Sequence, residues 1–155
     1  MTKIRLTKEF RFEMAHALYN YDGLCKNIHG HSYILQVTVL GVPEQNPASP
    51  KLGMVMDFGD LKAIVNREIV NDLDHAIVVS NKVAPELIAS LGQMGERHFI
   101  LNYQPTCENM LIDFVDRLQK ALPPQVELFS LKLHETANSF AEWYAQDNAT
   151  ASPLS

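Results

Sequence analysis

Two stretches in which apolar and polar side chains alternate constrain the fold of this chain more than any other feature. Residues 10–16 read Phe-Arg-Phe-Glu-Met-Ala-His, and residues 33–40 read Tyr-Ile-Leu-Gln-Val-Thr-Val-Leu. Because successive side chains of a strand point to opposite faces, this pattern predicts two strands with one face turned toward a core. We place these strands at residues 3–16 and 29–42, and the loop between them carries turn-forming residues.

Three histidines lie where these strands meet the loop. His29 and His31 share one face of the second strand, about 6.5 Å apart along it, and His16 continues the inward parity of the first strand. If the strands pair, three imidazoles converge. Three protein ligands with one open position are typical of catalytic rather than structural zinc. A His-x-His pair alone is common, so this interpretation depends on His16. Cys25 lies close enough to be a fourth ligand, but it need not be one.

Composition narrows the functional class. The chain has 155 residues and 46% hydrophobic residues, which predicts one globular domain, placed at residues 1–145. A net charge of −5 without a basic run argues against binding to nucleic acid or a membrane surface. No apolar run approaches the length of about 18 residues that suggests a membrane span. Two cysteines form no disulfide framework, which suits a reduced, cytoplasmic compartment. We expect residues 146–155 to be a disordered tail.

The remaining elements predict an α+β fold. Helical apolar spacing indicates helices at residues 59–73 and from 106 to the proline pair at 123–124, and alternation indicates strands at 126–135 and 139–144. Residues 53–58 read as a short strand or an extended approach to the first helix. Residues 76–105 are the least legible, with a short helix at 85–91 and a strand at 98–103 as candidates. The order predicts an antiparallel four-stranded sheet with two helices packed on one face.

Carboxylates mark two further candidate positions. Asp74 and His75 directly follow the first helix, and a carboxylate beside an imidazole makes a serviceable general acid or base. From spacing alone, an ordinary surface pair is the simpler interpretation. Glu135 ends the apolar face of a strand, and a buried carboxylate needs a partner. A ligand with two adjacent N–H donors would satisfy both oxygens, whereas an exposed strand-end glutamate would need no ligand.

Several motifs resemble the 6-pyruvoyl-tetrahydropterin synthase family. His16 in Met-Ala-His, followed by Cys25 in Cys-x-x-x-His-Gly-His-Ser-Tyr, is similar to the zinc and nucleophile signature of that family. The three residues between Cys25 and His29 resemble the 6-carboxytetrahydropterin synthase branch, because pyruvoyl-forming members typically have a longer gap. Leu-Asp-His at 73–75, Pro-Thr-x-Glu-Asn at 105–109 and Glu-Thr at 135–136 also resemble family motifs. The matches cover most of the chain outside 43–52, 80–104 and the tail.

The resemblance implies a fold, an assembly and a set of roles. The fold is the tunnelling fold, in which subunits join their sheets edge to edge into a barrel, here as a homohexamer of two trimers. Such closure would also cover the open edges of a four-stranded sheet. The implied zinc ligands are His16, His29 and His31. Cys25, Asp74 and His75 are the implied catalytic residues, acting together, and Thr106, Glu108 and Glu135 the implied pterin-binding residues.

The activity implied by the short-gap branch is that of a zinc-dependent lyase. It would convert 7,8-dihydroneopterin triphosphate to 6-carboxy-5,6,7,8-tetrahydropterin, releasing triphosphate and acetaldehyde, in queuosine and 7-deazapurine biosynthesis. Three alternatives stay open: formation of 6-pyruvoyltetrahydropterin from the same substrate, a non-catalytic pterin- or purine-binding module, and a structural zinc protein. The presence of Cys25, Asp74 and His75 argues against a module without activity. The residues that hold the triphosphate are not identified.

Overall fold

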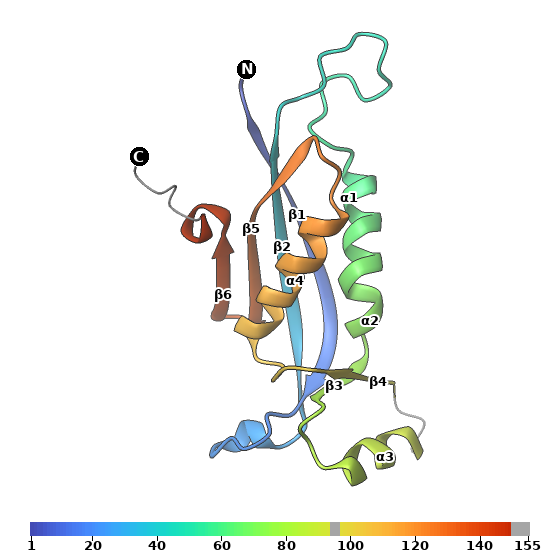
Figure 1. The fold of residues 1–155 in the computed structure, drawn as a ribbon, viewed down its shortest axis with the longest axis vertical. Coiled ribbons are helices and arrows are strands. Elements are labelled where there is room, and N and C mark those ends of the chain that lie inside the picture. The colour runs from blue at the N-terminus through green and yellow to red at the C-terminus, as the bar shows by residue number, and fades with distance from the viewer. Residues whose placement is uncertain (94–96, 150–155) are drawn as a thin grey trace, which may run out of the picture.

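A mixed sheet of six strands forms the centre of the molecule. The structure is a computed structural model, and it describes residues 1–93 and 97–149 (Figure 1). The sheet has the order β4-β3-β1-β2-β5-β6. The strands are β1 Ile4–His16, β2 His29–Gly41, β3 Ala76–Ser80, β4 His98–Leu101, β5 Val126–Thr136 and β6 Ser139–Tyr144. β1, β2, β5 and β6 pair antiparallel, while β1–β3 and β3–β4 pair parallel.

The expected four-stranded antiparallel sheet is therefore too small, although the α+β class is confirmed. The two additional strands come from residues 76–105, which the sequence leaves ambiguous. β3 has five residues and β4 has four, and apolar runs this short fit a strand or a buried helix equally well. Their parallel pairing needs a crossover, and helix α3 (Pro85–Gln93) provides it.

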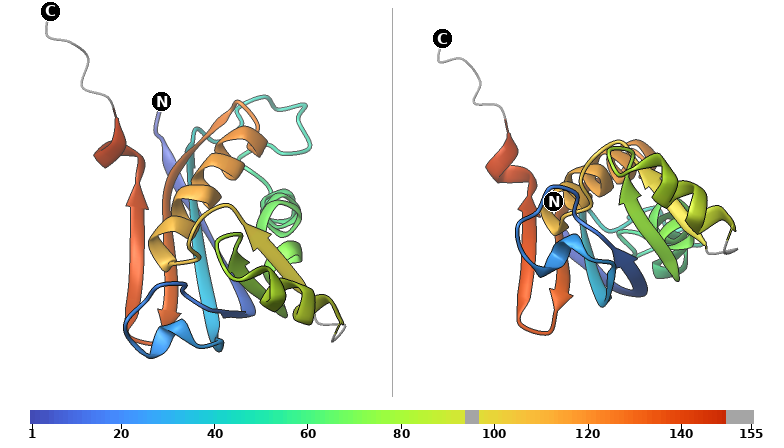
Figure 2. Two further views of the ribbon diagram at one scale, coloured as in Figure 1. Left: turned by 60° about the horizontal axis from the view of Figure 1, so that its bottom comes forward. Right: turned by 90° about the horizontal axis from the view of Figure 1, so that it is seen from below.

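The long helices cover one face of this sheet (Figures 1 and 2). A continuous helical run consists of α1 (Phe58–Val65), the π-helical segment η2 (Asn66–Val70) and α2 (Asn71–Leu73). It matches the helix expected at 59–73, and Asp57 caps its start by accepting from the Gly59 N–H. α4 (Cys107–Ala121) matches the second expected helix and is capped by Thr106. Residues 53–57 form no strand and lead directly into α1.

The predicted parity of β1 and β2 agrees with the burial of their side chains. Phe10, Phe12 and Met14 are buried, whereas the charged side chains between them are exposed. The buried face packs against α1 and α4, including the fully buried Leu61 and Phe114. No helix in the described ranges is long and apolar enough to cross a membrane.

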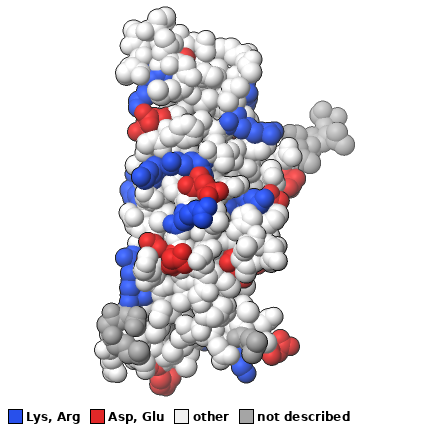
Figure 3. Space-filling model, turned by 180° about the vertical axis from the view of Figure 1, so that it is seen from behind, with Lys and Arg blue, Asp and Glu red and all other residues white. Residues whose placement is uncertain are grey.

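The two ends of the molecule differ. The loop of residues 17–28 and α3 lie at one end, and the connection of residues 42–57 lies at the other (Figure 1). Ala145–Asn148 forms a short 3-10 helix after β6, where we expected a disordered tail from residue 146. Residues 150–155 of that expected tail lie outside the described residues. The sheet face away from the helices carries Lys, Arg, Asp and Glu side chains in a band (Figure 3).

Candidate metal centre and active site

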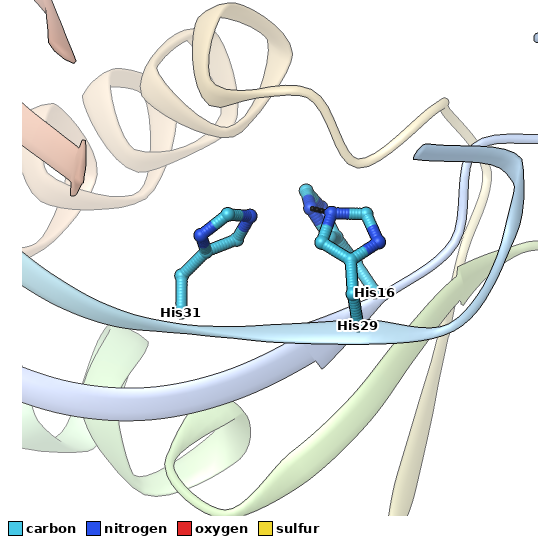
Figure 4. A group of neighbouring side chains, drawn as sticks. All are labelled: His16, His29 and His31. Carbon is cyan, nitrogen blue, oxygen red and sulfur yellow. Dashed lines mark hydrogen bonds between the residues drawn. The ribbon is translucent and has the colours of Figure 1, made fainter. Parts of the chain in front are cut away.

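Strand pairing brings the three predicted histidines together. His16 ends β1 and lies opposite His29, the first residue of β2, while His31 follows two positions later on the same face. One nitrogen from each ring lies within 4.8 Å of those from the other two, and the His16 and His29 Nε2 atoms are 3.0 Å apart. All three imidazoles rise from the same side of the strands (Figure 4). This is the spacing of three ligands around one ion.

Backbone carbonyls orient two of the rings. His16 Nδ1 donates to the Pro105 carbonyl at 2.7 Å, and His29 Nδ1 donates to the Asn27 carbonyl at 2.7 Å. With the proton on Nδ1, each Nε2 carries the lone pair that a metal needs. Burial lowers the pKa of His16 and of His31, which keeps both rings in the neutral form that binds metal.

His31 supplies a separate test of whether the site fits a cation. Its Nε2 atom is buried and forms no hydrogen bond with any described residue. A buried polar atom without a partner is unusual and calls for an explanation. Three converging nitrogens, one of them without a partner, fit Zn²⁺, which binds imidazole nitrogens at about 2.0–2.1 Å.

A cavity of about 280 Å³ adjoins His16. Four of the residues singled out in the sequence line it: Cys25, Thr106, Glu108 and Glu135. They come from three segments, namely the 3-10 turn Leu24–Lys26, the start of α4 and the end of β5. The fold thus gathers a thiol, two carboxylates and a hydroxyl beside the imidazoles.

The two cysteines that line this cavity differ in accessibility. Cys25 is a free, partly exposed thiol. Cys107 is buried, and its Sγ atom donates to the Leu133 carbonyl at 3.3 Å. Burial, reinforced by the charge of Glu135, raises the pKa of Cys107 to about 11. Cys107 therefore stays protonated at neutral pH, and Cys25 is the thiol available for chemistry.

Glu135 lines the cavity and lies beside His31. Its Oε1 atom is 3.8 Å from His31 Nε2, and its side chain is 28% exposed. Tyr33 lies in the same region, although sequence reasoning did not single it out. Its side chain is 1% exposed, and its pKa is raised above the usual range by burial and by the neighbouring Glu135 carboxylate. The inward parity of position 33 was the available signal, but it equally fits a core residue.

Asp74 and His75 form the close pair that the sequence suggests, at the junction of α2 and β3. His75 Nδ1 lies 3.0 Å from Asp74 Oδ1, and the same oxygen accepts from the Glu13 N–H at 2.9 Å. Burial alone would raise the pKa of Asp74, but the Glu13 N–H and His75 outweigh burial and lower it. His75 has φ of 59°, a strained conformation for a non-glycine residue, of the kind found at functional sites.

Asp74 and His75 are absent from the lining of the cavity that holds Cys25. His75 lines a separate hollow of about 360 Å³, together with Glu13 and Ser32. The Ser32 hydroxyl donates to Glu13 at 2.7 Å, and both side chains belong to the outward parity of their strands. That Cys25, Asp74 and His75 act together stays a prediction, since His75 and Cys25 line different hollows of one chain.

A larger hollow, of about 900 Å³, lies near the opposite end of β1 and β2. Its lining includes Lys3, Gln45, Asp57 and Arg67, and none of the candidate site residues. Lys51, also in its lining, already pairs with Asp57 at 2.5 Å. Size alone therefore does not identify the functional site, because the candidate thiol, carboxylates and hydroxyl line the smaller cavity beside His16.

Comparison with known proteins gives a consistent result. The family model described as 6-pyruvoyl tetrahydropterin synthase matches residues 5–146. A 6-carboxy-5,6,7,8-tetrahydropterin synthase of Haemophilus influenzae is 35% identical over 141 residues, covering 90% of this chain and 97% of the relative. An uncharacterized protein of Wolinella succinogenes has a similar fold, with a TM-score of 0.77, 19% identity and coverage of 94% and 99%. The Caenorhabditis elegans 6-pyruvoyl tetrahydropterin synthase has a TM-score of 0.66 and 23% sequence identity, and the match covers 94% of this chain and 97% of that chain.

Proposed function

The chain belongs to the 6-pyruvoyl tetrahydropterin synthase family, and from this premise we propose that it is a 6-carboxy-5,6,7,8-tetrahydropterin synthase. The substrates are 7,8-dihydroneopterin triphosphate and one water molecule, and the co-products are triphosphate and acetaldehyde. The observation that carries the proposal is the cavity beside His16, which combines a free thiol with a strand-end carboxylate next to three converging imidazoles. The naming of the Haemophilus influenzae relative favours the carboxy-forming reaction.

His16, His29 and His31 would hold a zinc ion beside this cavity. When bound, the ion supplies Lewis acidity toward the hydroxyl groups of the substrate side chain and a fixed point of attachment for them. The carbonyls of Pro105 and Asn27 keep two of the imidazoles in the tautomer and orientation required. Cys25 stays outside this ligand set, because a fourth protein ligand would close the position that the substrate needs.

Proton transfer is assigned to Cys25 and His75. The Cys25 thiolate removes a proton from the substrate side chain. His75, oriented by Asp74, acts as the second acid–base group of the reaction. The Asp74 carboxylate fixes the orientation of the His75 ring, with Oδ1 3.0 Å from Nδ1. A reduced, cytoplasmic compartment would keep Cys25 in the thiol state that this role requires.

Recognition of the substrate ring is assigned to the far side of the cavity. Glu135 accepts from the two adjacent N–H donors of the pterin ring, which gives a charge-assisted, bidentate contact. Thr106 and Glu108, at the start of α4, also line the cavity. The Thr106 hydroxyl already accepts from the Asn109 N–H at 3.2 Å, so it is held in place before the substrate arrives.

The separation of Cys25 from His75 leads to a proposal about assembly. The Asp74–His75 pair of one subunit completes the cavity of its neighbour, so that each active site is shared. The sheet has edges suited to such contacts: β3 pairs only with Met14–His16 of β1, which leaves the rest of that β1 edge without a strand partner among the described residues, and β6 forms the far edge. Edge-to-edge joining of these strands into the expected ring of three, stacked as a hexamer, would remove both open edges.

Product identification tests the proposed reaction. Purified, zinc-loaded protein is incubated with 7,8-dihydroneopterin triphosphate and the products are identified by mass. We expect 6-carboxytetrahydropterin, with acetaldehyde released in equal amount. A 6-pyruvoyl product without acetaldehyde would assign the protein to the rival reaction, and pterin binding without turnover would indicate a binding module. Reaction with the substrate analogue lacking the triphosphate serves as the control for specificity.

A further inference from the structure

Tyr33 carries a buried hydroxyl that has no partner among the described residues. The side chain is 1% exposed, and its ring stacks on Phe12 with centroids 5.2 Å apart. Its edge also contacts the rings of His16 and His31, at 6.3 and 5.7 Å between centroids. Packing on these sides leaves the ring a single orientation. Because a buried hydroxyl without a hydrogen bond is costly, a partner for it is expected in the working protein.

Strand register identifies the group that the hydroxyl faces. In the β2–β5 pair, Leu35 lies opposite Leu133 and Ile34 opposite His134. Tyr33 and Glu135 occupy the next positions, both with the inward parity of Leu35 and Leu133. The two side chains therefore meet at the wall of the cavity that Glu135 lines.

Two other polar neighbours of Glu135, His31 and Cys107, do not serve as its donor. His31 Nε2 is 3.8 Å from the carboxylate, beyond a hydrogen bond. If this Nε2 acts as a metal ligand, it offers a lone pair and has no proton to give. Cys107, which also lies near Glu135, donates its thiol proton to the Leu133 carbonyl instead. The Tyr33 hydroxyl is left as the donor placed to orient this carboxylate.

We propose that Tyr33 is a positioning residue whose hydroxyl donates to the Glu135 carboxylate and fixes its direction toward the cavity. The inference rests on the proposed function, which gives Glu135 a pterin ring to bind. A carboxylate has lone pairs enough to accept from Tyr33 and from two ligand N–H groups together. A held carboxylate favours a ring with paired N–H donors, as in a 2-amino-4-oxopteridine, over a 2,4-dioxopteridine that lacks the amino group.

The test is the pair of dissociation constants of zinc-loaded Tyr33→Phe for pterin and for the 2,4-dioxo analogue. Loss of a hydrogen bond to a charged group should weaken pterin binding about tenfold, while binding of the analogue and the zinc content stay unchanged. The control is Tyr103→Phe, which removes another partly buried hydroxyl, bonded to Asp113 at 2.6 Å and outside the cavity lining. This control should change neither dissociation constant.

A double-mutant cycle with Glu135→Ala separates positioning from general packing. When the carboxylate is absent, adding Tyr33→Phe should cause no further loss of pterin affinity. Equal losses in both backgrounds, or wild-type pterin affinity in Tyr33→Phe with its zinc bound, would overturn the inference. If Glu135→Ala weakens pterin binding and Tyr33→Phe does not, only the role of Tyr33 fails. If Glu135→Ala has no effect either, the proposed pterin contact fails with it.

Discussion

Three of the functional side chains are held by a specific contact with the backbone. The imidazoles of His16 and His29 are oriented by carbonyls from two different loops. The carboxylate of Asp74 is anchored on the Glu13 N–H, at the edge of β1. Such contacts fix tautomer and direction before a metal or substrate binds, which reduces the cost of ordering the site.

Removal of one imidazole tests the metal centre. In His31→Ala the remaining two ligands should bind zinc at least about tenfold more weakly, because one coordinate bond is lost. The matched control is His134→Ala, since His134 has the opposite strand parity and packs against Phe140, with ring centroids 4.8 Å apart. Metal analysis after dialysis measures the effect. Full zinc occupancy in His31→Ala would remove this residue from the site.

Replacement of Cys25 separates metal binding from catalysis. As a proton-transfer group and not a ligand, Cys25→Ala should keep its zinc while turnover falls by about 10² or more. Loss of metal together with activity would instead make Cys25 a fourth ligand. Zinc content and initial rates are measured on the same preparation.

Alkylation provides an independent check on the two thiols. At neutral pH iodoacetamide should modify Cys25 and inactivate the enzyme, and bound substrate should protect it. Cys107 is buried and its pKa is raised to about 11. Only a small fraction of Cys107 is therefore the reactive thiolate unless the pH approaches 11. Mass spectrometry of the peptides identifies the modified residue. Modification of Cys107 before Cys25 would contradict the assignment.

Sequence reasoning at this scale succeeds where strand parity decides the answer. The inward positions of His16, His29 and His31, and of Glu135, follow from alternation alone, and the structure brings them together. Tyr33 was missed, because an inward tyrosine in an apolar strand is equally well explained as core. Which hollow each of Cys25 and His75 lines is set by tertiary packing, on which local motifs carry no information.

At the scale of elements, the helical run before Asp74 contains a π-helical turn that α4 supports. Within this turn, the Glu68 carbonyl accepts from Arg117 Nη1 at 2.9 Å. The same guanidinium pairs with Asp113 at 2.7 Å and with Asp72 at 3.2 Å. Arg117 thus ties α4 to the end of the helix that delivers Asp74 and His75. π turns are frequent at functional sites, where they adjust the direction of the following residues.

Loss of this contact should destabilise the protein measurably. Arg117→Met removes the guanidinium bonds to the Glu68 carbonyl and to Asp113, which keeps its bond from the Tyr103 hydroxyl. Arg117 is only 22% exposed at this site. We expect the free energy of unfolding in urea to fall by about 1–3 kcal/mol. The control, Lys120→Met, removes an exposed i,i+4 pair with Asp116 and should cost about 0.5 kcal/mol or less. Equal effects of the two substitutions would show that Arg117 is an ordinary surface charge.

Helices were easier to predict than short strands. The apolar spacing of residues 59–73 and the Thr106 cap located both long helices within one or two residues. The π turn left no signal, because its residues continue the same apolar face. β3 was ambiguous because its partner lies far away in the sequence. It pairs with β1, and each pair of partner residues is more than 60 positions apart in the chain. Tertiary pairing, and not local propensity, decides such elements.

At the scale of the whole molecule, the active-site groups are divided between two hollows. The thiol and the carboxylate that would bind the ring line one hollow, and the Asp74–His75 pair borders the other. The sheet face away from the helices is charged, with Arg5 stacked over Phe129 and Lys132 over Phe140 at 3.9 Å in each case. The proposed shared site requires a subunit that functions only in an assembly. Light scattering should therefore find the active species to be several times the 17.5 kDa chain, and an active monomer would contradict the shared site.

Subunit mixing tests the shared active site most directly. Cys25→Ala and His75→Ala are each prepared alone and then assembled together in equal amounts, and turnover of 7,8-dihydroneopterin triphosphate is measured. Each variant alone should be nearly inactive. In the mixture, some sites combine an intact Cys25 with an intact His75 of a neighbour, and random assembly predicts recovery of about a quarter of the wild-type rate. Turnover in the mixture that stays at the level of the separate variants would show that Cys25 and His75 do not meet across a subunit boundary.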